Sequence, residues 1–394
     1  MSAESIVIVG IGESQLGFVE GSTSLSLCAD AAVEALKDAN LTKNDIDGLI
    51  TTDSYVRYHN RHAVQLAQYM GLSSDLRVAD TMTGGSSVAG GLGIHYGAAM
   101  ISGGLCNVVM LACGDNLASA DGRDNAVQAY AMNFEREFEA AYGPVIPARY
   151  AFTARRFMHE RGTTRDQLSA VAVSMREWAS RNPRALKRTP ITIADVTASK
   201  RIASPLHMLD CSLVSDGAGA VLMMRESEAK SRGLRGIRVS GMGSSHGTGS
   251  GLVHDSVSFQ GSFVSYGCDH SLAPALKQSG LSRKNVDLCY LYDCFSINVL
   301  VMLEDLGFCK PGEAGAFVAE GHTRPGGSLP VNTHGGLMSY CHSGKPGGAF
   351  MLTEAVRRLR AGKSDGIVRE PEVALIQGHG GHAGIHVTTL LSAH

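Results

Sequence analysis

The chain has 394 residues, which at about 150 residues per domain corresponds to two or three units or to one large α/β fold. Hydrophobic residues make up 44% and charged residues 18% of the chain, a composition that excludes an intrinsically disordered protein. The net charge of −2 leaves no strong basic field, so nucleic acid and anionic membrane surfaces are poor candidates for partners.

The first predicted strand lies close to the N-terminus and runs into a turn that contains glycine. No basic region precedes a long apolar run there, so we expect no signal peptide. The segment VIVGIGESQLG has Gly10 and Gly12 of the dinucleotide fingerprint, but Gln15 stands where the third glycine would be. We therefore interpret the segment as a structural turn and not as a NAD site.

Residues 35–53 recur, without a gap, as residues 275–293. The sequence ALKDANLTKNDIDGLITTD aligns with ALKQSGLSRKNVDLCYLYD, and the shared pattern is that of a helix end, a capped turn and a strand. A second echo relates VGIGES to SGMGSS, each after a β-rich run. Both echoes keep the same order, so we predict two similar α/β halves, residues 1–230 and 231–394.

Residues 81–114 contain no Asp, Glu, Lys or Arg and therefore need a test as a membrane span. A span needs about 20 predominantly apolar residues, whereas this stretch begins with TMTGGSSVAGG. We interpret it as a buried helix followed by a buried strand. At the helix start, Gly84 and Gly85 either present backbone N–H groups to an oxyanion or phosphate, or allow close helix–strand packing. The sequence leaves both interpretations open.

The first half is longer than the second because of a surplus between residues 116 and 204. Residues 133–162 and 163–183 of this predicted insertion have the pattern of charged amphipathic helices. Thr164 and its neighbour Thr163 precede Gln167 as in a capping signal. We expect the insertion to cap the end of the sheets where α/β folds bind ligands. Its basic residues form either a solvated helical face or a surface for an anionic nucleotide tail: Arg149, Arg155, Arg156, Arg181, Arg184, Lys187 and Arg188.

Three polar, glycine-bearing loops follow predicted strands in the C-terminal half. They carry Tyr292, His342 and His379, whose side chains are candidates for acid–base catalysis. The spacing of His379, His382 and His386 would suit a metal site on a helix, but the glycines between them predict an extended loop. We therefore expect no metal. The nine scattered cysteines include no CxxC pair, which favours the reducing cytoplasm and argues against structural zinc.

These loops and the central segment 204–220 resemble the thiolase superfamily, most closely the sterol-carrier-protein type thiolases, and the resemblance runs essentially from end to end. YDCF at 292–295 occupies the place of the thiolase Asn-Glu-Ala-Phe-like motif. PVNTHGG at 330–336 leads to the loop whose catalytic histidine falls on His342, and GHGG at 378–381 forms the last loop. The resemblance implies a duplicated five-layer α/β/α/β/α fold with a helical loop-domain insertion, which agrees with the internal repeat.

The main departure from this family is the missing nucleophile. Thiolases attack with a cysteine at the start of the charge-free helix, where the ungapped match places Met82. No cysteine lies between Cys28 and Cys106, and the second thiolase cysteine, in the last loop, is also absent, with Gly378 nearest to its place. A thioether forms no thioester, and a threonine would need a dedicated base. Retro-aldol cleavage needs no acyl-enzyme.

The pattern is similar to that of the lipid-transfer-protein-like steroid side-chain aldolases, which are thiolase-shaped and lack the nucleophile. Those enzymes cleave a β-hydroxyacyl-CoA whose hydroxyl carbon belongs to a steroid ring. One catalytic tyrosine of that group matches Tyr292, and the second falls on His342, with Tyr340 two residues earlier. The resemblance also implies an OB-fold partner protein with a zinc ribbon, and a homodimer within a larger complex.

We assign chemical roles from side-chain type. Free histidine has a pKa of about 6.5 and free tyrosine one of about 10, so His342 is the expected general base and Tyr292 the proton donor or shuttle, with the roles exchangeable. His379 is the expected oxyanion donor, together with backbone N–H groups near the two glycines of the helix start. The alternative for each is a loop-stabilising hydrogen bond. The CoA part of the substrate is expected to contact Met82, Gly84, Gly85, Arg184 and Gly380, and no separate cofactor is expected.

Three functions therefore compete. The leading hypothesis is a CoA-thioester carbon–carbon lyase that cleaves a β-hydroxyacyl-CoA to a ketone or aldehyde and a shorter acyl-CoA. The second is a thiolase-like acyltransferase with an unusual or partner-supplied nucleophile; Cys294 and Cys341 would need depressed pKa values to serve. The third is a non-catalytic thiolase-like subunit that binds CoA. The missing cysteine argues against the second, and the retained polar loop residues argue against the third.

Overall fold

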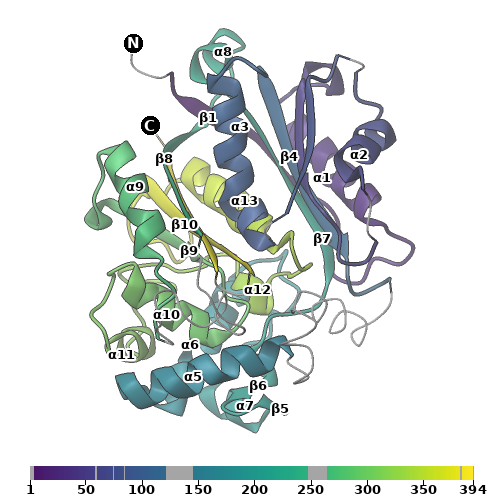
Figure 1. Ribbon diagram of the computed structural model, residues 1–394. Helices are drawn as coiled ribbons and strands as arrows, with labels where there is room; N and C mark the ends of the chain where they lie inside the picture. The colour runs from purple at the N-terminus through teal and green to yellow at the C-terminus, as the bar shows by residue number, and fades with distance from the viewer. Residues whose placement is uncertain are drawn as a thin grey trace.

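A long mixed sheet organises the chain, whose computed structural model describes residues 4–57, 60–73, 75–83, 85–120, 145–246, 264–381 and 384–393. Within these ranges nine strands follow the order β3-β2-β4-β7-β1-β8-β11-β10-β9 (Figure 1). The strands are β1 (Ile6–Glu13), β2 (Gly48–Thr52), β3 (Val78–Met82), β4 (Val108–Asn116), β7 (Asp216–Arg225), β8 (Ile237–His246), β9 (Leu288–Leu291), β10 (Val373–Gly380) and β11 (Ile385–Ser392).

The two half-sheets repeat one strand order. In the first half β1 lies beside β7, followed by β4, β2 and β3, and in the second half β8 lies beside β11, followed by β10 and β9. Val331 forms a parallel bridge to Cys289 of β9, in the place that β3 takes in the first half. The half-sheets join where Ile8 of β1 pairs with Ile237 of β8. The repeated order agrees with the predicted duplication, while the boundary at residue 230 stays a prediction.

Helices lie between and outside the half-sheets and give the fold five layers. α3 and α13 lie in the middle (Figure 1), where α13 contacts β7 and β1 on one side and β10 and β9 on the other. α1 and α2 cover the outer face of the first half-sheet, and α9 covers that of the second. This is the α/β/α/β/α arrangement that the resemblance implied. The helices are α1 (Ser24–Asp38), α2 (His62–Met70), α3 (Gly93–Ser102), α5 (Ile146–Arg161), α6 (Arg165–Arg181), α7 (Ile193–Ala198), α8 (Glu226–Ser231), α9 (Asp269–Ser279), α10 (Ser296–Asp305), α11 (Ala314–Ala319), α12 (Gly336–Ser339) and α13 (Gly347–Ala361).

Each half packs a helix closely against its first strand, and glycine makes this contact possible. α1 lies on β1 and α9 lies on β8. A Cβ atom on Gly12 would lie 2.1 Å from the carbonyl oxygen of Ala31, and one on Gly243 would lie 2.0 Å from that of Ser271. VGIGES and its echo therefore serve helix–strand packing. The predicted structural turn is wrong, because the glycines of the two segments lie inside the strands β1 and β8.

The duplicated residues Asp47 and Asp287 do the same task in the two halves. The Asp47 carboxylate accepts a hydrogen bond of 2.8 Å from the backbone N–H of Val108, at the start of β4. The Asp287 carboxylate accepts one of 3.0 Å from the backbone N–H of Val373, at the start of β10. Each carboxylate thereby fixes two neighbouring strands at their starts, β2 and β4 in the first half and β9 and β10 in the second.

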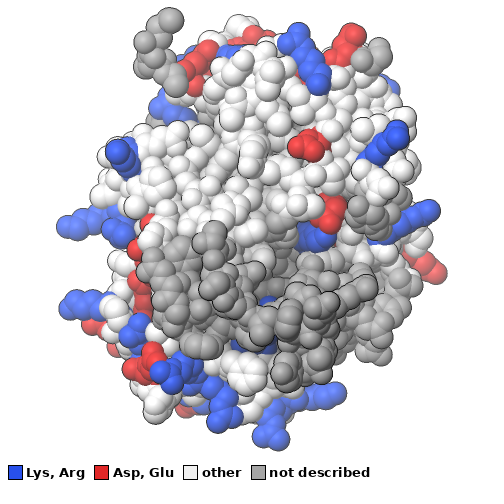
Figure 2. Space-filling model, in the orientation of Figure 1, with Lys and Arg blue, Asp and Glu red and all other residues white. Residues whose placement is uncertain are grey.

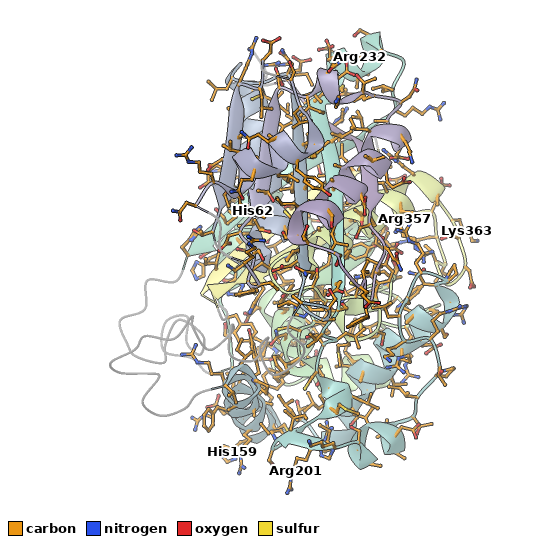
Figure 3. The ribbon with its side chains drawn as sticks, turned by 90° about the vertical axis from the view of Figure 1, so that its right-hand side faces the viewer. His62, His159, Arg201, Arg232, Arg357 and Lys363 are labelled. Carbon is orange, nitrogen blue, oxygen red and sulfur yellow. The ribbon has the colours of Figure 1, made fainter. Side chains whose placement is uncertain are left out.

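The predicted insertion contributes a helical cap at one end of the molecule. α5 and α6 lie below the sheet in Figure 1, together with α7 and the hairpin of β5 (Arg201–Ala203) and β6 (Leu206–His207). Figure 3 shows Arg201 at the opposite end of the molecule from Arg232. The predicted capping signal is confirmed, because Thr164 and Gln167 form a capping box at the start of α6. Residues 121–144, which include the start of the predicted helix 133–162, lie outside the described residues.

The charge-free stretch 81–114 is largely buried, although α3 exposes Tyr96 and the turn after it exposes Leu105. It contains the end of β3, the π-helical turn η2 (Val88–Leu92), α3 and most of β4. Every residue of β4 is buried, as the interpretation of a buried strand predicted. In the described part of the chain no helix combines the length and the apolar character needed to cross a membrane.

Candidate active site

The three predicted acid–base side chains meet at one edge of the second half-sheet. Tyr292 directly follows β9, and His379 lies near the end of the parallel neighbour β10. Parallel strands end on the same side of a sheet, which brings these two side chains together. Their rings stack, with centroids 5.6 Å apart and planes inclined by 8°. His342 enters from the loop between α12 and α13, and its ring meets Tyr292 edge-on at 6.0 Å.

Tyr292 forms the centre of a hydrogen-bonded chain. Its hydroxyl lies 2.8 Å from Nε2 of His342 and 2.6 Å from Oγ of Ser86. Ser86 belongs to the glycine-rich segment after β3, and its hydroxyl also reaches the carbonyl oxygen of Gly344 at 2.9 Å. The serine has one hydroxyl proton, so it donates either to this carbonyl or to the phenolic oxygen. When the phenol donates to the imidazole, the short contact with Tyr292 requires that the serine donate to the phenolic oxygen.

The surroundings of His342 determine its tautomer. Nδ1 lies 3.2 Å from the carbonyl oxygen of Leu213, which can only accept a hydrogen bond. Nδ1 therefore carries the proton, and Nε2 accepts from Tyr292. Burial lowers the pKa of His342 to about 4, so the imidazole is neutral at neutral pH. The geometry thus presents Tyr292 with a neutral proton acceptor.

Asp293 holds the loop that carries His342. Its carboxylate accepts a hydrogen bond of 2.8 Å from the backbone N–H of Leu337 in α12. Gly336 precedes this residue with a φ of +66°, and a Cβ atom there would lie 2.0 Å from the carboxylate. Glycine alone fits this turn. Burial raises the pKa of Asp293 to about 7, against the backbone N–H groups that favour its ionised form.

Sequence reasoning missed Tyr150, which reaches the site from α5 of the insertion. Its hydroxyl lies 2.8 Å from Nε2 of His379, and its ring stacks on Phe295 at 4.6 Å. Both Tyr150 and His379 are buried. The one signal in the sequence was a tyrosine on a helix otherwise rich in charge, and no motif marks it.

A second layer of polar side chains lies behind His379. His386 pairs with His379 across β10 and β11, with the two rings edge to face at 5.4 Å. Nδ1 of His386 lies 3.3 Å from Sγ of Cys268. In the part of the chain that the structure describes, no three metal-binding side chains come together. His382, the middle residue of the metal pattern considered above, lies outside the described residues.

The residues expected at the CoA thioester lie in two places. Gly85 and Gly380 approach each other, since a Cβ atom on Gly85 would lie 3.6 Å from the Cα atom of Gly380. Met82 ends β3 and packs against the cluster of Val88, Leu92 and Val387, so a thioether stands at the predicted nucleophile position. Gly84 lies outside the described residues. The role of these residues in CoA binding stays a prediction.

Arg184 and Tyr340 belong to a different cluster, around Glu13. The carboxylate of Glu13 is fully buried and accepts hydrogen bonds from both side chains. Tyr340 therefore bonds Glu13, although it lies two residues before His342 in sequence. Arg357, labelled in Figure 3, reaches the same carboxylate from α13. Arg184 thus has a carboxylate partner already, and its predicted contact with CoA is untested.

The two cysteines closest to the site loops are buried thiols. The sulfur of Cys294 accepts a hydrogen bond of 3.0 Å from Nδ2 of Asn298, and that of Cys341 lies 3.1 Å from Oγ of Ser215. Burial raises the pKa of both thiols. A nucleophilic cysteine needs a lowered pKa, so neither environment suits attack on a thioester.

Family descriptions match both halves of the chain. The description "Thiolase, N-terminal domain" matches residues 6–227, and "Thiolase C-terminal domain-like" matches residues 249–393. The first match alone covers more than half of the chain. The fold and both halves of the sequence therefore lead to one family.

Individual relatives cover almost the whole chain. The chain is 31% identical to a 17-hydroxy-3-oxo-4-pregnene-20-carboxyl-CoA lyase of Mycobacterium tuberculosis, over 96% of this chain and 98% of the relative. It is 29% identical to an acetyl-CoA acetyltransferase of Methanothermobacter thermautotrophicus, over 97% and 98%. The solved Ltp2-ChsH2(DUF35) aldolase superposes with a TM-score of 0.84 at 29% identity, over 98% of this chain and 97% of the other.

Proposed function

Because the chain belongs to the thiolase superfamily and carries Met82 in place of the nucleophile, we propose that it cleaves a β-hydroxyacyl-CoA by a retro-aldol reaction. The products are a ketone or aldehyde and a shorter acyl-CoA. The observation that carries the proposal is the hydrogen bond from Tyr292 to the neutral imidazole of His342. A retro-aldol reaction needs a base for the β-hydroxyl, and this pair supplies one without any acyl-enzyme.

The reaction moves one proton and breaks one carbon–carbon bond. The β-hydroxyl gives its proton to the Tyr292 oxygen as the phenolic proton passes to Nε2 of His342. The bond between the hydroxyl carbon and the α-carbon breaks, and its electron pair forms the thioester enolate. The enolate then takes a proton at the α-carbon from the Tyr292 hydroxyl, and the imidazolium of His342 returns its extra proton to the phenol, which restores both side chains. The carbonyl of Leu213 at Nδ1 stabilises the transient imidazolium of His342.

The substrate class follows from the relatives. The M. tuberculosis relative is named for a carboxyl-CoA, and the structural neighbour is an aldolase. We propose a CoA thioester with its β-hydroxyl on a ring carbon, with steroid side chains as the first class to test. In the described part of the chain no carboxylate pairs with Arg155, Lys187 or Arg188, so these basic residues are the proposed contacts for the nucleotide tail of CoA.

A thiolase-like acyltransferase is the second candidate, because the acetyltransferase relative covers the chain as fully as the lyase does. This function would require a nucleophile in place of Met82. Burial raises the pKa of the Cys294 and Cys341 thiols, so the nucleophile would have to come from a partner.

We also propose two kinds of partner. The structural neighbour contains a DUF35 component, and a small OB-fold protein with a zinc ribbon is the partner proposed for this chain. Figure 2 shows a broad face over α3 with few charged side chains, where Tyr96 is half exposed. An uncharged face of this kind suits a contact between two copies of the chain. All nine cysteines are free thiols, which suits the proposed cytoplasmic location.

A cleavage assay with two substrates tests the function. One is a β-hydroxyacyl-CoA with a tertiary hydroxyl on a ring, and the other is the matching β-ketoacyl-CoA with free CoA. Both are assayed with and without the zinc-ribbon protein. We expect cleavage of the hydroxy compound without added CoA, and no mass increase of the chain from an acyl adduct. Cleavage of the keto compound alone, and only with CoA, would overturn the retro-aldol proposal.

A further inference from the structure

We infer that Tyr150 is a positioning residue that fixes the tautomer of His379 and thereby makes this histidine an oxyanion donor to the thioester. The inference rests on the proposed function for the identity of the substrate. It deepens that function, because it gives the insertion helix α5 a part in the chemistry of a site otherwise built by the second half-sheet.

The position of the Tyr150 hydroxyl is fixed on two sides. Its ring stacks on Phe295 with centroids 4.6 Å apart and planes inclined by 26°. Its oxygen lies 2.8 Å from Nε2 of His379. Tyr150 is 4% exposed and His379 is 2% exposed, so water does not compete for this hydrogen bond.

The direction of the hydrogen bond follows from the available acceptors. Burial raises the pKa of Tyr150 well above its usual value, so the phenol keeps its proton and must donate it. The other nearby atom is the sulfur of Cys294, a weak acceptor that already receives a hydrogen bond of 3.0 Å from Asn298. Tyr150 therefore donates to Nε2 of His379, and the proton of the neutral imidazole is on Nδ1.

This assignment gives the two histidines opposite tasks. His342 accepts a proton at Nε2 from Tyr292, whereas His379 has its Nε2 occupied by Tyr150 and keeps an N–H group only at Nδ1. The ring of His379 lies parallel to that of Tyr292 at 5.6 Å. A base and a donor thus lie side by side. This matches a substrate in which only the α-carbon separates the hydroxyl-bearing carbon from the thioester carbonyl carbon. The donor bonds the enolate oxygen and no covalent bond to the protein forms.

Infrared spectroscopy of a bound thioester tests the inference without requiring turnover. The probe is propionyl-CoA labelled with carbon-13 at the carbonyl, bound to the full-length chain with its zinc-ribbon partner. A donor to the carbonyl lowers its stretching frequency relative to free propionyl-CoA. We expect this lowering in the wild type, and a smaller lowering in Tyr150→Phe and in His379→Phe. NMR of protein labelled with nitrogen-15 in histidine should show the Nδ1-protonated tautomer of His379 in the wild type, and its loss in Tyr150→Phe.

A matched control separates this role from a structural one. Tyr290→Phe removes another buried phenolic hydroxyl, which is bonded to Thr333 at 2.9 Å, and should leave the carbonyl frequency unchanged. In the cleavage assay we expect Tyr150→Phe to lower kcat by about 10- to 100-fold with little change in KM, since an oxyanion donor acts mainly in the transition state.

The outcomes separate the inference from the proposed function. A lowered carbonyl frequency that depends on Tyr150, in a protein that does not cleave the hydroxyacyl-CoA, would overturn the function and support the inference. An unshifted carbonyl in the wild type would overturn the inference. An unchanged shift and an unchanged His379 tautomer in Tyr150→Phe would also overturn it.

Discussion

Tyr292 and His342 are 50 residues apart in sequence, yet the phenolic oxygen lies 2.8 Å from Nε2 of the imidazole. The carbonyl of Leu213 on the other side of the ring fixes the tautomer that accepts this hydrogen bond. In the proposed reaction this pair takes the proton of the β-hydroxyl, in a chain with a thioether at the expected nucleophile position. The proposed chemistry is therefore acid–base catalysis and not covalent catalysis.

Tyr292→Phe is expected to lower kcat for cleavage of the hydroxyacyl-CoA by about 10²- to 10⁴-fold, because it removes the group that transfers the proton to His342. KM should change little, since the aromatic ring remains. Steady-state measurement of ketone release checks this. Tyr290→Phe, a loss of the same hydroxyl two residues earlier on β9, should keep near-wild-type activity. Equal loss in both variants would contradict the assigned role.

His334 should make the protein less stable in acid. Burial lowers its pKa to about 4, whereas in the unfolded chain the pKa is about 6.5. As pH falls through this interval the unfolded state binds a proton that the folded state does not, so the free energy of unfolding decreases. Between pH 7 and pH 5 the free energy of unfolding, measured with urea, should fall in both proteins. We expect the fall to be about 2 kcal/mol smaller in His334→Leu than in the wild type. His95 and His342, whose pKa values are also about 4, contribute equally to the pH dependence of both proteins. If the free energy of unfolding falls by the same amount in both proteins, the prediction is contradicted.

Glu13→Gln should destabilise the fold by about 3 kcal/mol, because it leaves Arg184 and Arg357 without their shared carboxylate. Burial opposes the charge of Glu13, yet the two guanidinium groups hold the pKa of its carboxyl below the usual value. Thermal or urea unfolding at pH 7 measures the loss. Glu34→Gln, which breaks an exposed pair with Lys37, should cost about 0.5 kcal/mol or less. A small effect of Glu13→Gln would show that the cluster contributes little.

Gly243→Ala should destabilise the protein by about 1–3 kcal/mol, because the added Cβ atom would lie 2.0 Å from the carbonyl oxygen of Ser271 and force α9 away from β8. Ser244→Ala changes the exposed neighbour on the same strand and should be close to neutral. Comparison of the two melting temperatures checks the prediction. Wild-type stability of Gly243→Ala would mean that the helix moves at no cost.

Local patterns in the sequence were sufficient to predict the duplication. The aligned residues Asp47 and Asp287 bond the starts of equivalent strands, and the glycines of the two echoes meet equivalent helices. Both features could be found because the two halves repeat the same residue types at equivalent positions, although Asp47 and Asp287 bond strands that begin 61 and 86 residues further along the chain. The same reasoning correctly predicted that most of residues 81–114 are buried, although one face of α3 is exposed.

The contacts between distant segments were harder to predict from the sequence. Arg184 is predicted to contact the CoA, which stays untested, and the structure also pairs it with the carboxylate of Glu13, 171 residues away in sequence. Tyr340, which lies two residues before His342 in sequence, bonds the same carboxylate. Spacing along the chain says nothing about which charged groups meet in three dimensions, so such pairs escaped prediction.

The sequence by itself determined the family, the duplicated α/β architecture, the absence of the nucleophile at Met82 and the identity of the three loop residues. Those features depend on residue type and on the order of neighbouring residues in the chain. Only the tertiary structure decided which nitrogen of each histidine accepts a hydrogen bond, because Leu213 and Tyr150 come from segments far from the histidines that they contact. The direction of a proton transfer depends on such partners, and the folded chain alone brings them within 3 Å or so of each other.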